Sequence, residues 1–588
     1  MASLTQYLTQ LFQQALTEVG ADPAYGQAIP SNRPDLGQFQ VNGALAAAKS
    51  LKRNPRELAQ AILDALPQKE NFADLSIAGP GFINIRLTDE FLLQQSQAIH
   101  DDARLGLEMV TRPRRVLVDY GGYNVAKVLH VGHLRPTIIG ESIRRVFVHA
   151  GDNVIGDVHL GDWGLQMGQL IEEIRLRQPD LPYFDPNYTG PYPDESPVTM
   201  DDLLTLYPQA SARAKEDATF AAAARQATFD LQHNQPGYRA LWQHFVNVSI
   251  ADIKRHLALL ETEYDFWLGE SHAEPYLEDM LNRLKRDGHA YESQGALVMD
   301  VTEPEDKKEI PPLILVKRDG AVLYGTTDLA TIDMRVQEFR SEFITYVVDI
   351  RQAMHFKQVF RAAHKSGIAT GVELEHAGFG TINGPDGRPF KSRSGDAATL
   401  GDILQMCLDK AAERVAEIDS AGEYSPEDRA NIARYVGMAT IKFADLMNHR
   451  SSDYILDVDR FSAFEGKTGP YLLYSTVRAK SILRKASEAG LAPGPLVTPT
   501  TDVERDLLLQ LSAWPDVFWQ AYHERAPHHL CEYTYQVATA FNRFYRECHI
   551  LREPDEARQA GWLGLTNLTR RMLEQVLALL NISFPERM

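Results

Sequence analysis

Cysteine is scarce in this 588-residue chain, which has three cysteines and no C-x-x-C pair. Cys407, Cys531 and Cys548 are too few and too scattered for a disulfide framework or a zinc knuckle. Intracellular proteins are usually kept reduced, and this cysteine usage fits such a compartment. We therefore expect a cytoplasmic protein without a structural metal.

Long apolar runs are also missing. No stretch of about 18 apolar residues occurs, so the sequence predicts no membrane-spanning helix and no membrane partner. The first residues, MASLTQYLTQLFQQ, have neither the basic start nor the apolar centre of a signal peptide. We expect this segment to form an amphipathic helix instead.

The third absence is an excess of positive charge. Lys and Arg number 60 against 79 Asp and Glu, which gives a formal net charge of −19. A general nucleic-acid binder usually carries a basic footprint, so this balance argues against one. It leaves room for a specific RNA partner, contacted through local basic clusters such as Arg112, Arg114 and Arg115, or Arg570 and Arg571.

What the chain does contain is typical of a large globular protein, with 44% hydrophobic and 24% charged residues. Its length predicts three or four domains. We predict an α/β module over residues 1–110 and an all-helical domain over 406–588. Between them, over 111–405, we predict a Rossmann-like, doubly wound parallel sheet with an insertion around 175–260.

Hydrophobic periodicity predicts the individual elements. Helices are expected over 3–19, 41–65 with a new start at 54–55, 134–147, 210–232, 238–260 and from 353. Strands are expected over 74–77, 82–87, 116–118, 295–300, 313–316, 322–324 and 343–348. Residues 178–209 are rich in Pro, Asp and Tyr and are expected to form a surface excursion. A linker at 490–495 interrupts the C-terminal helices.

The densest motif lies between residues 116 and 168. A buried strand is followed by a turn and by a helix that begins after His130-Val131-Gly132-His133. A helix N-terminus presents N–H groups and a positive dipole end to phosphate. Gly132 has no Cβ and would let an adenine ring approach, and either imidazole could donate to phosphate oxygens as charge moves between them. Taken alone, the two histidines also fit capping or packing.

The surrounding residues carry a resemblance. NVAKVLHVGHLRPTIIGESIRR, followed by HLGDWGLQMG, closely resembles the signature region of class I aminoacyl-tRNA synthetases, specifically the arginyl-tRNA synthetase family. The resemblance implies a Rossmann-like catalytic domain between an N-terminal tRNA-recognition domain and a C-terminal anticodon-binding bundle.

The activity that the resemblance implies is arginine–tRNA ligation. L-Arginine and ATP give arginyl-adenylate and pyrophosphate, and arginine then passes to the 3′ end of tRNA(Arg). ATP with Mg²⁺ is a substrate in this scheme, and no cofactor stays bound. Activation is expected to depend on tRNA, and the protein is expected to be a monomer.

A guanidinium substrate needs carboxylates and planar acceptors in a fork geometry. The sequence offers such groups just after predicted strands, and by resemblance the arginine-binding residues are Asp119, Asn124, His130, Tyr324, Asp328 and Gln352. Asp119, Tyr324 and Asp328 would face the guanidinium. Two alternatives stay open: Asp328 caps a helix, and Tyr324 and Gln352 are ordinary surface residues.

The second class I signature, K-M-S-K-S, is incomplete. Its place reads Lys391-Ser392-Arg393-Ser394, and by resemblance Lys127, just upstream of the histidines, compensates. The resemblance thus assigns catalysis to His130, His133, Lys127, Lys391 and Arg393. It assigns ATP binding to His130, Gly132, His133, Lys391 and Ser392. Without the resemblance, residues 391–395 fit a solvated basic loop.

Two segments resemble RNA contacts of the family. LGQFQVN resembles its D-Y-Q-x-N segment, and Phe39, Gln40 and Asn42 are candidates for stacking on an unpaired base and hydrogen bonding to it. The P-Y-x-x-Y element that meets the anticodon loop corresponds to Tyr471 and Tyr474, with the terminal Met588 near the same surface. The alternatives are a helix entry with a buried aromatic at Phe39 and core packing of the two tyrosines.

Two other functions stay open. One is a different class I synthetase or nucleotidyltransferase, against which Asp119, Asp328 and the lack of zinc ligands or a long editing insertion argue. The other is a catalytically silent tRNA-binding relative, against which the complete set of nucleotide-site histidines and lysines argues. The segment HLGDWG resembles a family turn, in which we expect Asp162 to be mainly structural.

Overall fold

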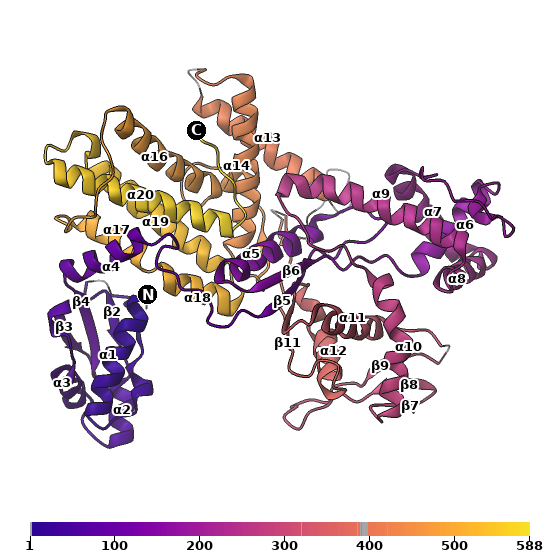
Figure 1. The fold of residues 1–588 in the computed structure, drawn as a ribbon, viewed down its shortest axis with the longest axis horizontal. Coiled ribbons are helices and arrows are strands. Elements are labelled where there is room, and N and C mark those ends of the chain that lie inside the picture. Colours follow the sequence, from indigo (N-terminus) through magenta and orange to yellow (C-terminus); the bar gives the residue numbers. More distant parts are fainter. Residues whose placement is uncertain are drawn as a thin grey trace. The chain divides into compact units, whose positions relative to one another are not determined.

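The computed structural model describes residues 3–33, 35–318, 320–384, 386–388, 390, 398–419 and 422–588. The chain separates into two compact units, one formed by Met1–Met109 with Ala463–Met588 and the other by Val110–Ser462. Figure 1 labels their elements along the chain. That the chain divides near residues 110 and 405 stays a prediction.

The N-terminal module of the first unit is a helix-covered antiparallel sheet. Its elements are α1 Leu4–Glu18, α2 Ala44–Leu51, α3 Pro55–Ala65 and the strands β1 Ala28–Pro30, β2 Phe39–Val41, β3 Phe72–Ala78 and β4 Phe82–Leu87. The strand order is β1-β2-β4-β3. Ser3 begins α1 through a capping box with Gln6, and Asn54 caps α3 ahead of Pro55. The predicted helices and strand pair of this module are confirmed.

The rest of the first unit is helical. Its helices are α4 Asp89–Asp101, α16 Gly469–Glu488, α17 Asp502–Ser512, α18 Trp514–Glu524, α19 His528–Glu547 and α20 Glu556–Leu579. Residues 490–501 have no helix or strand, so the predicted linker is confirmed. The Oγ atoms of Ser96 on α4 and Ser512 on α17 lie 3.0 Å apart. Arg571 on α20 donates to the carbonyls of His100 and Asp102, so α4 is fixed to this bundle.

The second unit contains a four-stranded parallel sheet. Its strands are β5 Arg115–Asp119, β6 Asn153–Asp157, β10 Phe343–Tyr346 and β11 Glu373–His376. Their order is β11-β10-β5-β6, and every neighbouring pair is parallel. The chain runs from β5 outward to β6 on one side, and it later adds β10 on the other. The strand order therefore reverses beside β5, and ligands of open α/β sheets bind at such a point, beyond the carboxyl ends of the strands.

Two of the helices beside the sheet begin at the predicted residues 134 and 353, and the helix that begins at 324 was not predicted. The three helices are α5 Leu134–Ala150, α11 Tyr324–Phe339 and α12 Ala353–Lys365. Residues Leu134–Ile143 of α5 are all buried. One contact on this helix is a buried ion pair, in which Arg135 Nε donates to Asp445 Oδ1 of α14 (Pro426–Leu446) over 2.8 Å. Together with α13 (Leu400–Ile418), α14 belongs to the second unit.

The insertion differs from prediction at its start. It contains α6 Leu165–Arg177, α7 Met200–Glu216, α8 Ala218–Gln232 and α9 Pro236–Leu260. Helix was expected only from 210, but α7 begins ten residues earlier, behind a capping box of Thr199 and Asp202. The cap and the buried Leu203 and Leu206 outweigh Pro208 within the helix.

The strands at 296–299 and 313–316 belong to a separate antiparallel sheet. Its strands are β7 Ala290–Ser293, β8 Ala296–Met299 and β9 Leu313–Val316, and α10 Glu270–Arg286 precedes it. A short apolar run fits either kind of sheet, so the sequence pattern could not assign these strands. The predicted strand at 322–324 is wrong, because Val322 forms only an isolated bridge with Val316 and Tyr324 begins α11.

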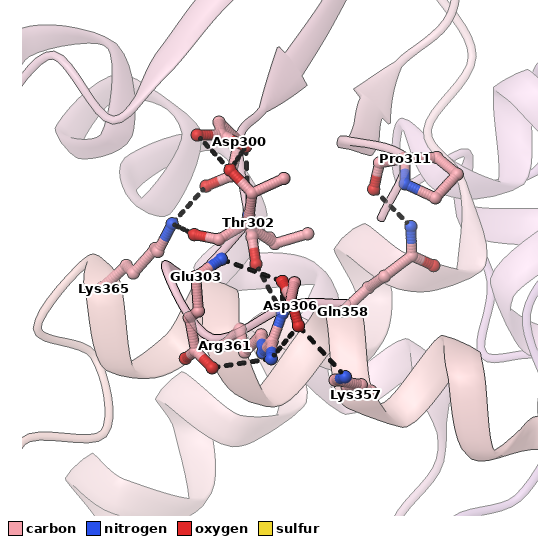
Figure 2. Close-up of polar contacts among 10 residues, drawn as sticks. Asp300, Thr302, Glu303, Asp306, Pro311, Lys357, Gln358, Arg361 and Lys365 are labelled. Carbon is pink, nitrogen blue, oxygen red and sulfur yellow. Dashed lines mark hydrogen bonds and ion pairs between the residues drawn. The ribbon is translucent and has the colours of Figure 1, made fainter. Parts of the chain in front are cut away.

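The connection between β8 and β9 is fixed to α12 by charged groups, as Figure 2 shows. Arg361 pairs with Asp306 at 2.7 Å and with Glu303 at 2.6 Å. The Arg361 guanidinium holds the pKa of Asp306 well below its usual range. Lys365 Nζ also donates to the carbonyl of Thr302 over 2.5 Å. These contacts hold residues 300–306 against one face of α12. They involve Arg361 and Lys365 and not the first turn of the helix.

Candidate active site

The carboxyl ends of the parallel strands meet around a buried guanidinium. Asp119 of β5 is in register with Asp157 of β6 and with Tyr346 of β10. Arg335 of α11 pairs with Asp119 and Asp157, each at 2.7 Å, and lies over the Tyr346 ring. Burial raises the pKa of Asp119, and the charge of Arg335 opposes that shift. The predicted arginine ligand Asp119 thus already has a guanidinium partner within the chain.

The histidine turn lies between β5 and α5. Residues Val131–His133 form a short 3-10 helix, and the His130 backbone N–H donates to His133 Nδ1 over 3.2 Å. The Gly132 N–H donates to His130 Nδ1 over 3.0 Å. Because both Nδ1 atoms accept, each neutral ring carries its proton on Nε2. Both rings can therefore donate from Nε2 to an anion.

Both histidines are held in the neutral form. Burial lowers the pKa of His133 to about 3, and burial and Lys127 lower the pKa of His130. The turn also requires a glycine, since a Cβ on Gly132 would lie 2.7 Å from His130 Cε1. The two histidines can thus act on a phosphate as uncharged donors, and positive charge beside that phosphate would have to come from other groups.

Asp328 and Tyr324 lie in the first turns of α11. Leu323 is the N-cap residue of that helix, so the alternative that Asp328 caps it is wrong. Asp328 Oδ2 instead lies 2.5 Å from His355 Nε2 of α12. Tyr324 is 74% exposed, so its phenol is available to a ligand. Gln352 is exposed directly before α12, and its binding role stays a prediction.

Glu270 is a site residue that the sequence pattern did not reveal. It is the first residue of α10, and burial, Asp162 and Asp328 together raise its pKa to about 8. Lys127 opposes that shift, so Glu270 lies in the electrostatic field of two predicted site residues. Nothing in the spacing of Glu270 from Asp328 points to this proximity. Two neighbouring carboxyl groups, one of them hard to ionise, are suited to a cationic ligand.

The HLGDWG segment pairs with the chain at Asn124 through an isolated bridge to Gly161. The Val125 N–H donates to the Gly161 carbonyl over 3.1 Å, and a Cβ on Gly161 would lie 2.5 Å from Asn124 Oδ1. Asp162 accepts from the Ser271 N–H over 3.0 Å and from Ser271 Oγ over 2.5 Å. The buried Asp162 therefore holds the first turn of α10, which agrees with a structural role for this turn.

The predicted loop residues Lys391, Ser392 and Arg393 lie outside the described residues. The described residues that follow them are bound to the histidine turn. The Val131 N–H donates to the Ala398 carbonyl over 3.1 Å, and the Leu400 N–H donates to the Leu129 carbonyl over 2.8 Å. The chain thus leaves the predicted basic loop directly beside His130.

The N-terminal RNA candidates differ in exposure. Phe39 is 8% exposed and belongs to the core of its module, which favours the packing interpretation over stacking on a base. Gln40 Nε2 donates to Asn84 Oδ1 over 3.0 Å. Asn42 Oδ1 is buried without a hydrogen-bond partner in the protein. Asn42 is therefore the member of this group with unsatisfied hydrogen-bonding capacity.

The C-terminal candidates lie on α16. The Tyr471 hydroxyl accepts from Asn542 Nδ2 over 3.0 Å, and this tyrosine is partly buried. Tyr474 is 39% exposed, and the Arg478 guanidinium lies 4.5 Å from its ring centroid. Arg478 also lies 5.2 Å from the ring centroid of Tyr545 on α19. Stacked aromatic and guanidinium planes of this kind are suited to unpaired RNA bases.

A basic groove adjoins these rings. It encloses about 440 Å³ and has no acidic side chain among its lining residues, which include Arg478, Lys485, Tyr545, Arg546, His549 and Arg552. In a protein with a net charge of −19 such a lining is a local exception. Beside it, Lys480 pairs with Glu586 at 2.6 Å and lies over the Phe584 ring, so the C-terminal segment follows α16 toward Met588.

Two features are absent from the described part of the chain, a metal-ligand cluster and a membrane-spanning helix. There, no group of three or more His, Cys, Asp or Glu side chains could hold a metal ion. Across the same residues, no helix is both long enough and apolar enough to cross a membrane.

Three family models together match most of the chain. They are described as tRNA synthetases class I (R), catalytic domain, over residues 94–458, Arginyl tRNA synthetase N terminal domain over 6–87 and DALR anticodon binding domain over 472–588. The fold and site are thus those of a class I aminoacyl-tRNA synthetase.

Proteins of similar sequence identify the family within this class. The chain is 46% identical over 590 residues to an arginine–tRNA ligase of Alkaliphilus oremlandii, and 46% identical over 589 residues to one of Maricaulis maris. Both alignments cover 100% of each chain. The chain belongs to the arginyl-tRNA synthetase family.

Solved structures agree at the level of the fold. The arginyl-tRNA synthetase of Plasmodium falciparum matches with a TM-score of 0.83 at 24% identity, covering 100% of both chains. The Thermus thermophilus enzyme matches with a TM-score of 0.78, also at 24% identity and 100% coverage of both chains. The predicted Rossmann-like fold with an α/β N-terminal domain and a helical C-terminal domain is confirmed.

Replacing His133 with Ala tests the role of the histidine turn. We expect His133→Ala to reduce kcat of arginine-dependent ATP–pyrophosphate exchange about 100-fold or more, the usual cost of losing one preorganised donor. The affinity for arginine should change little. His149→Ala, near the other end of α5, is the control and should retain kcat. Unchanged exchange in His133→Ala would remove this residue from the reaction.

Replacing Glu270 with Gln tests the role of the coupled carboxyl groups of Glu270 and Asp328. A bound guanidinium favours ionised Glu270, so arginine affinity of the unmodified protein should rise with pH up to about 8. We expect Glu270→Gln to raise KM for arginine about tenfold or more, since a charged hydrogen bond is lost. KM for ATP should stay within about twofold.

A stability measurement separates this effect from unfolding. The pKa of Glu270 is raised on folding, so the folded state binds this proton more tightly and loses stability as pH rises toward about 8. Glu270→Gln should therefore raise the Tm of the arginine-free protein at pH near 8. A lowered Tm together with a raised KM for both substrates would indicate damage to the fold instead.

Proposed function

We propose that the protein is an arginine–tRNA ligase whose arginine pocket is formed by Asp328, Glu270 and the exposed Tyr324. The observation that carries the pocket assignment is the electrostatic coupling of Glu270 to Asp328, which, after burial and Asp162, helps to raise the pKa of Glu270 to about 8. An ionised carboxylate is costly there without a cation. A guanidinium supplies that cation in a geometry that a carboxylate can accept through two hydrogen bonds.

The first step joins arginine to AMP. A carboxylate oxygen of arginine attacks the α-phosphorus of ATP, the bond from that phosphorus to the bridging oxygen breaks, and pyrophosphate leaves. His130 and His133 donate from Nε2 to phosphate oxygens, whose negative charge increases as pyrophosphate departs. Lys127 and, as a further proposal, Lys391 and Arg393 supply positive charge to the pyrophosphate. Asn124 and Gln352 are proposed to hold the amino and carboxyl ends of arginine.

Magnesium accompanies ATP in this scheme. The donor set near the histidine turn is imidazole and amine, which is unlike the oxygen set that Mg²⁺ prefers. The ion would therefore be held chiefly by phosphate oxygens, where it would neutralise negative charge. Arg335 keeps the ends of β5 and β6 in place during this step, because its guanidinium pairs with both strands.

The second step transfers arginine to tRNA(Arg). The 3′-terminal ribose hydroxyl attacks the arginyl carbonyl, and AMP leaves. We propose that Tyr471, Tyr474 and the terminal segment to Met588 contact the anticodon region, and that Gln40 and Asn42 contact an unpaired base elsewhere. Phe39 would support these two residues from the core. We further propose a cytoplasmic monomer whose arginine activation requires bound tRNA.

Arginine-dependent ATP–pyrophosphate exchange tests this function. We expect exchange with arginine when tRNA(Arg) is present, and none with lysine, whose ammonium cannot form the guanidinium fork. Exchange with arginine alone would keep the ligase and remove the dependence on tRNA. Equal exchange with lysine would point to a different class I synthetase, and no exchange in a folded preparation with tRNA would point to a silent relative.

The basic groove beside Tyr545 predicts a measurable contact with the tRNA phosphates. We expect Arg546→Ala to raise KM for tRNA(Arg) and to reduce the salt dependence of tRNA binding by about one counterion, with kcat largely retained. Arg543→Ala is the matched control on the same helix, because Arg543 pairs with Asp506 and Glu547 outside the groove. Equal effects of the two changes would contradict a specific contact at the groove.

A further inference from the structure

Asp328 has a partner that the reaction scheme does not use. His355 Nε2 lies 2.5 Å from Asp328 Oδ2, and the two residues come from adjacent helices, α12 and α11. The side chains are 28% and 25% exposed, so the pair is accessible to ligands as well as partly shielded. Further along α12, Arg361 and Lys365 hold the helix to residues 300–306 (Figure 2). His355 belongs to the same helix.

We propose that His355 is a positioning residue for arginine binding. In its neutral form it orients the Asp328 carboxylate, and in its protonated form it competes with the substrate guanidinium for that carboxylate. The inference rests on the proposed function, since Asp328 must bind arginine for His355 to affect it. It predicts that the affinity for arginine, and not for ATP, depends on the protonation of His355.

The geometry supports both parts of this role. A neutral imidazole with its proton on Nε2 donates one hydrogen bond to Oδ2 and leaves Oδ1 and a second lone pair of Oδ2 for a guanidinium. A protonated imidazole at the same distance is a cation beside the carboxylate, and it reduces the attraction that the substrate feels. Imidazole is also the side chain whose ordinary titration falls between about pH 5 and 8.

Other titratable groups surround the pair. Glu270 of α10 and Tyr346 of β10 are both electrostatically coupled to Asp328, and Lys127 acts on Glu270. On the side of α12, Arg351 pairs with Asp349 just before the helix. Burial, Asp162 and Asp328 raise the pKa of Glu270 to about 8, so Glu270 also contributes to the pH dependence of the unmodified protein. An experiment must therefore separate His355 from Glu270.

Two substitutions at His355 make that separation. His355→Gln keeps an N–H donor of similar reach but cannot be protonated, while His355→Ala removes the donor. KM for arginine and for ATP would be measured by pyrophosphate exchange with saturating tRNA(Arg) from about pH 6 to about pH 8.5, a range that spans imidazole titration. His364→Gln is the matched control on the same helix, because His364 Nε2 bonds the backbone carbonyl of Val372 instead.

The expected results differ between the variants. His355→Ala should raise KM for arginine about three- to tenfold at high pH, the usual effect of one hydrogen bond, with KM for ATP unchanged. At low pH the increase should be smaller, because the same change also removes the competing cation. His355→Gln should match the unmodified protein at high pH and lose part of the rise in KM on acidification. In Glu270→Gln, the part of the rise in KM that depends on His355 should still be present on acidification. His364→Gln should leave the whole pH profile of KM unchanged.

Three results would overturn the proposal. One is an unchanged KM for arginine in His355→Ala, and another is an equal rise of KM for arginine and ATP, which indicates a structural role. If His355→Ala does not fold, His355→Gln provides the test. The third contradicting result is a rise in KM for arginine on acidification that is the same in His355→Gln as in the unmodified protein. A failure of the proposed function looks different, because the unmodified protein would then show no preference for arginine.

Discussion

The structure of the site depends on the pairing of one buried guanidinium with two carboxylates. Arg335 is fully buried, and its partners Asp119 and Asp157 end neighbouring strands. Isolated charges at such depth would cost several kcal/mol each, and removing one partner of a buried pair usually destabilises a protein by about 3–5 kcal/mol. The guanidinium therefore fixes α11 against the ends of β5 and β6. Two segments leave from those strand ends, one leading to the histidine turn and the other carrying HLGDWG.

The electrostatics of the site then divide into two regions. At the helix N-terminus of α5, burial and Lys127 lower the pKa of both histidines, so the neutral rings can serve as oriented donors without adding charge. Around Asp328 and Glu270, carboxyl groups crowd together and one of them resists ionisation. The first region suits a polyanion accompanied by its own cation, and the second suits a cationic ligand. A substrate pair of ATP and arginine satisfies both conditions at once.

Local sequence patterns were sufficient for most of the fold. Caps at Ser3 and Asn54, alternating apolar residues in β4 and the buried run at 116–118 act over a few residues, and the elements they predict are present. The start of α7 and the sheet of β8 and β9 were missed. In the first case a local cap competed with an internal proline. In the second, the identity of the sheet depends on strand pairing between segments distant in the chain.

The residues of the candidate site also fall into two groups, those that the sequence predicted and those that only the structure shows. The histidine turn is a contiguous motif. The resemblance to the arginyl-tRNA synthetase family was sufficient to predict it as a site, together with Asp328. Arg335, Glu270 and His355 were not predicted, because each matters through a partner that is close in space and not in sequence. Arg335 meets Asp157 across 178 residues, and His355 meets Asp328 across 27. No spacing rule connects such pairs, so only the folded chain reveals them.

These pairs also change the meaning of Asp119. Two carboxylates, Asp119 and Asp157, face one internal guanidinium, which leaves at most one formal negative charge among the three groups. Much of the charge that Asp119 could offer to a substrate is thus already compensated by Arg335. Asp328 has a histidine partner that can be neutral, and Glu270 has no internal guanidinium among its main electrostatic neighbours. In the proposed function, discrimination in favour of a substrate guanidinium would therefore depend mainly on Asp328 and Glu270, while Asp119 pairs with Arg335 at the strand ends.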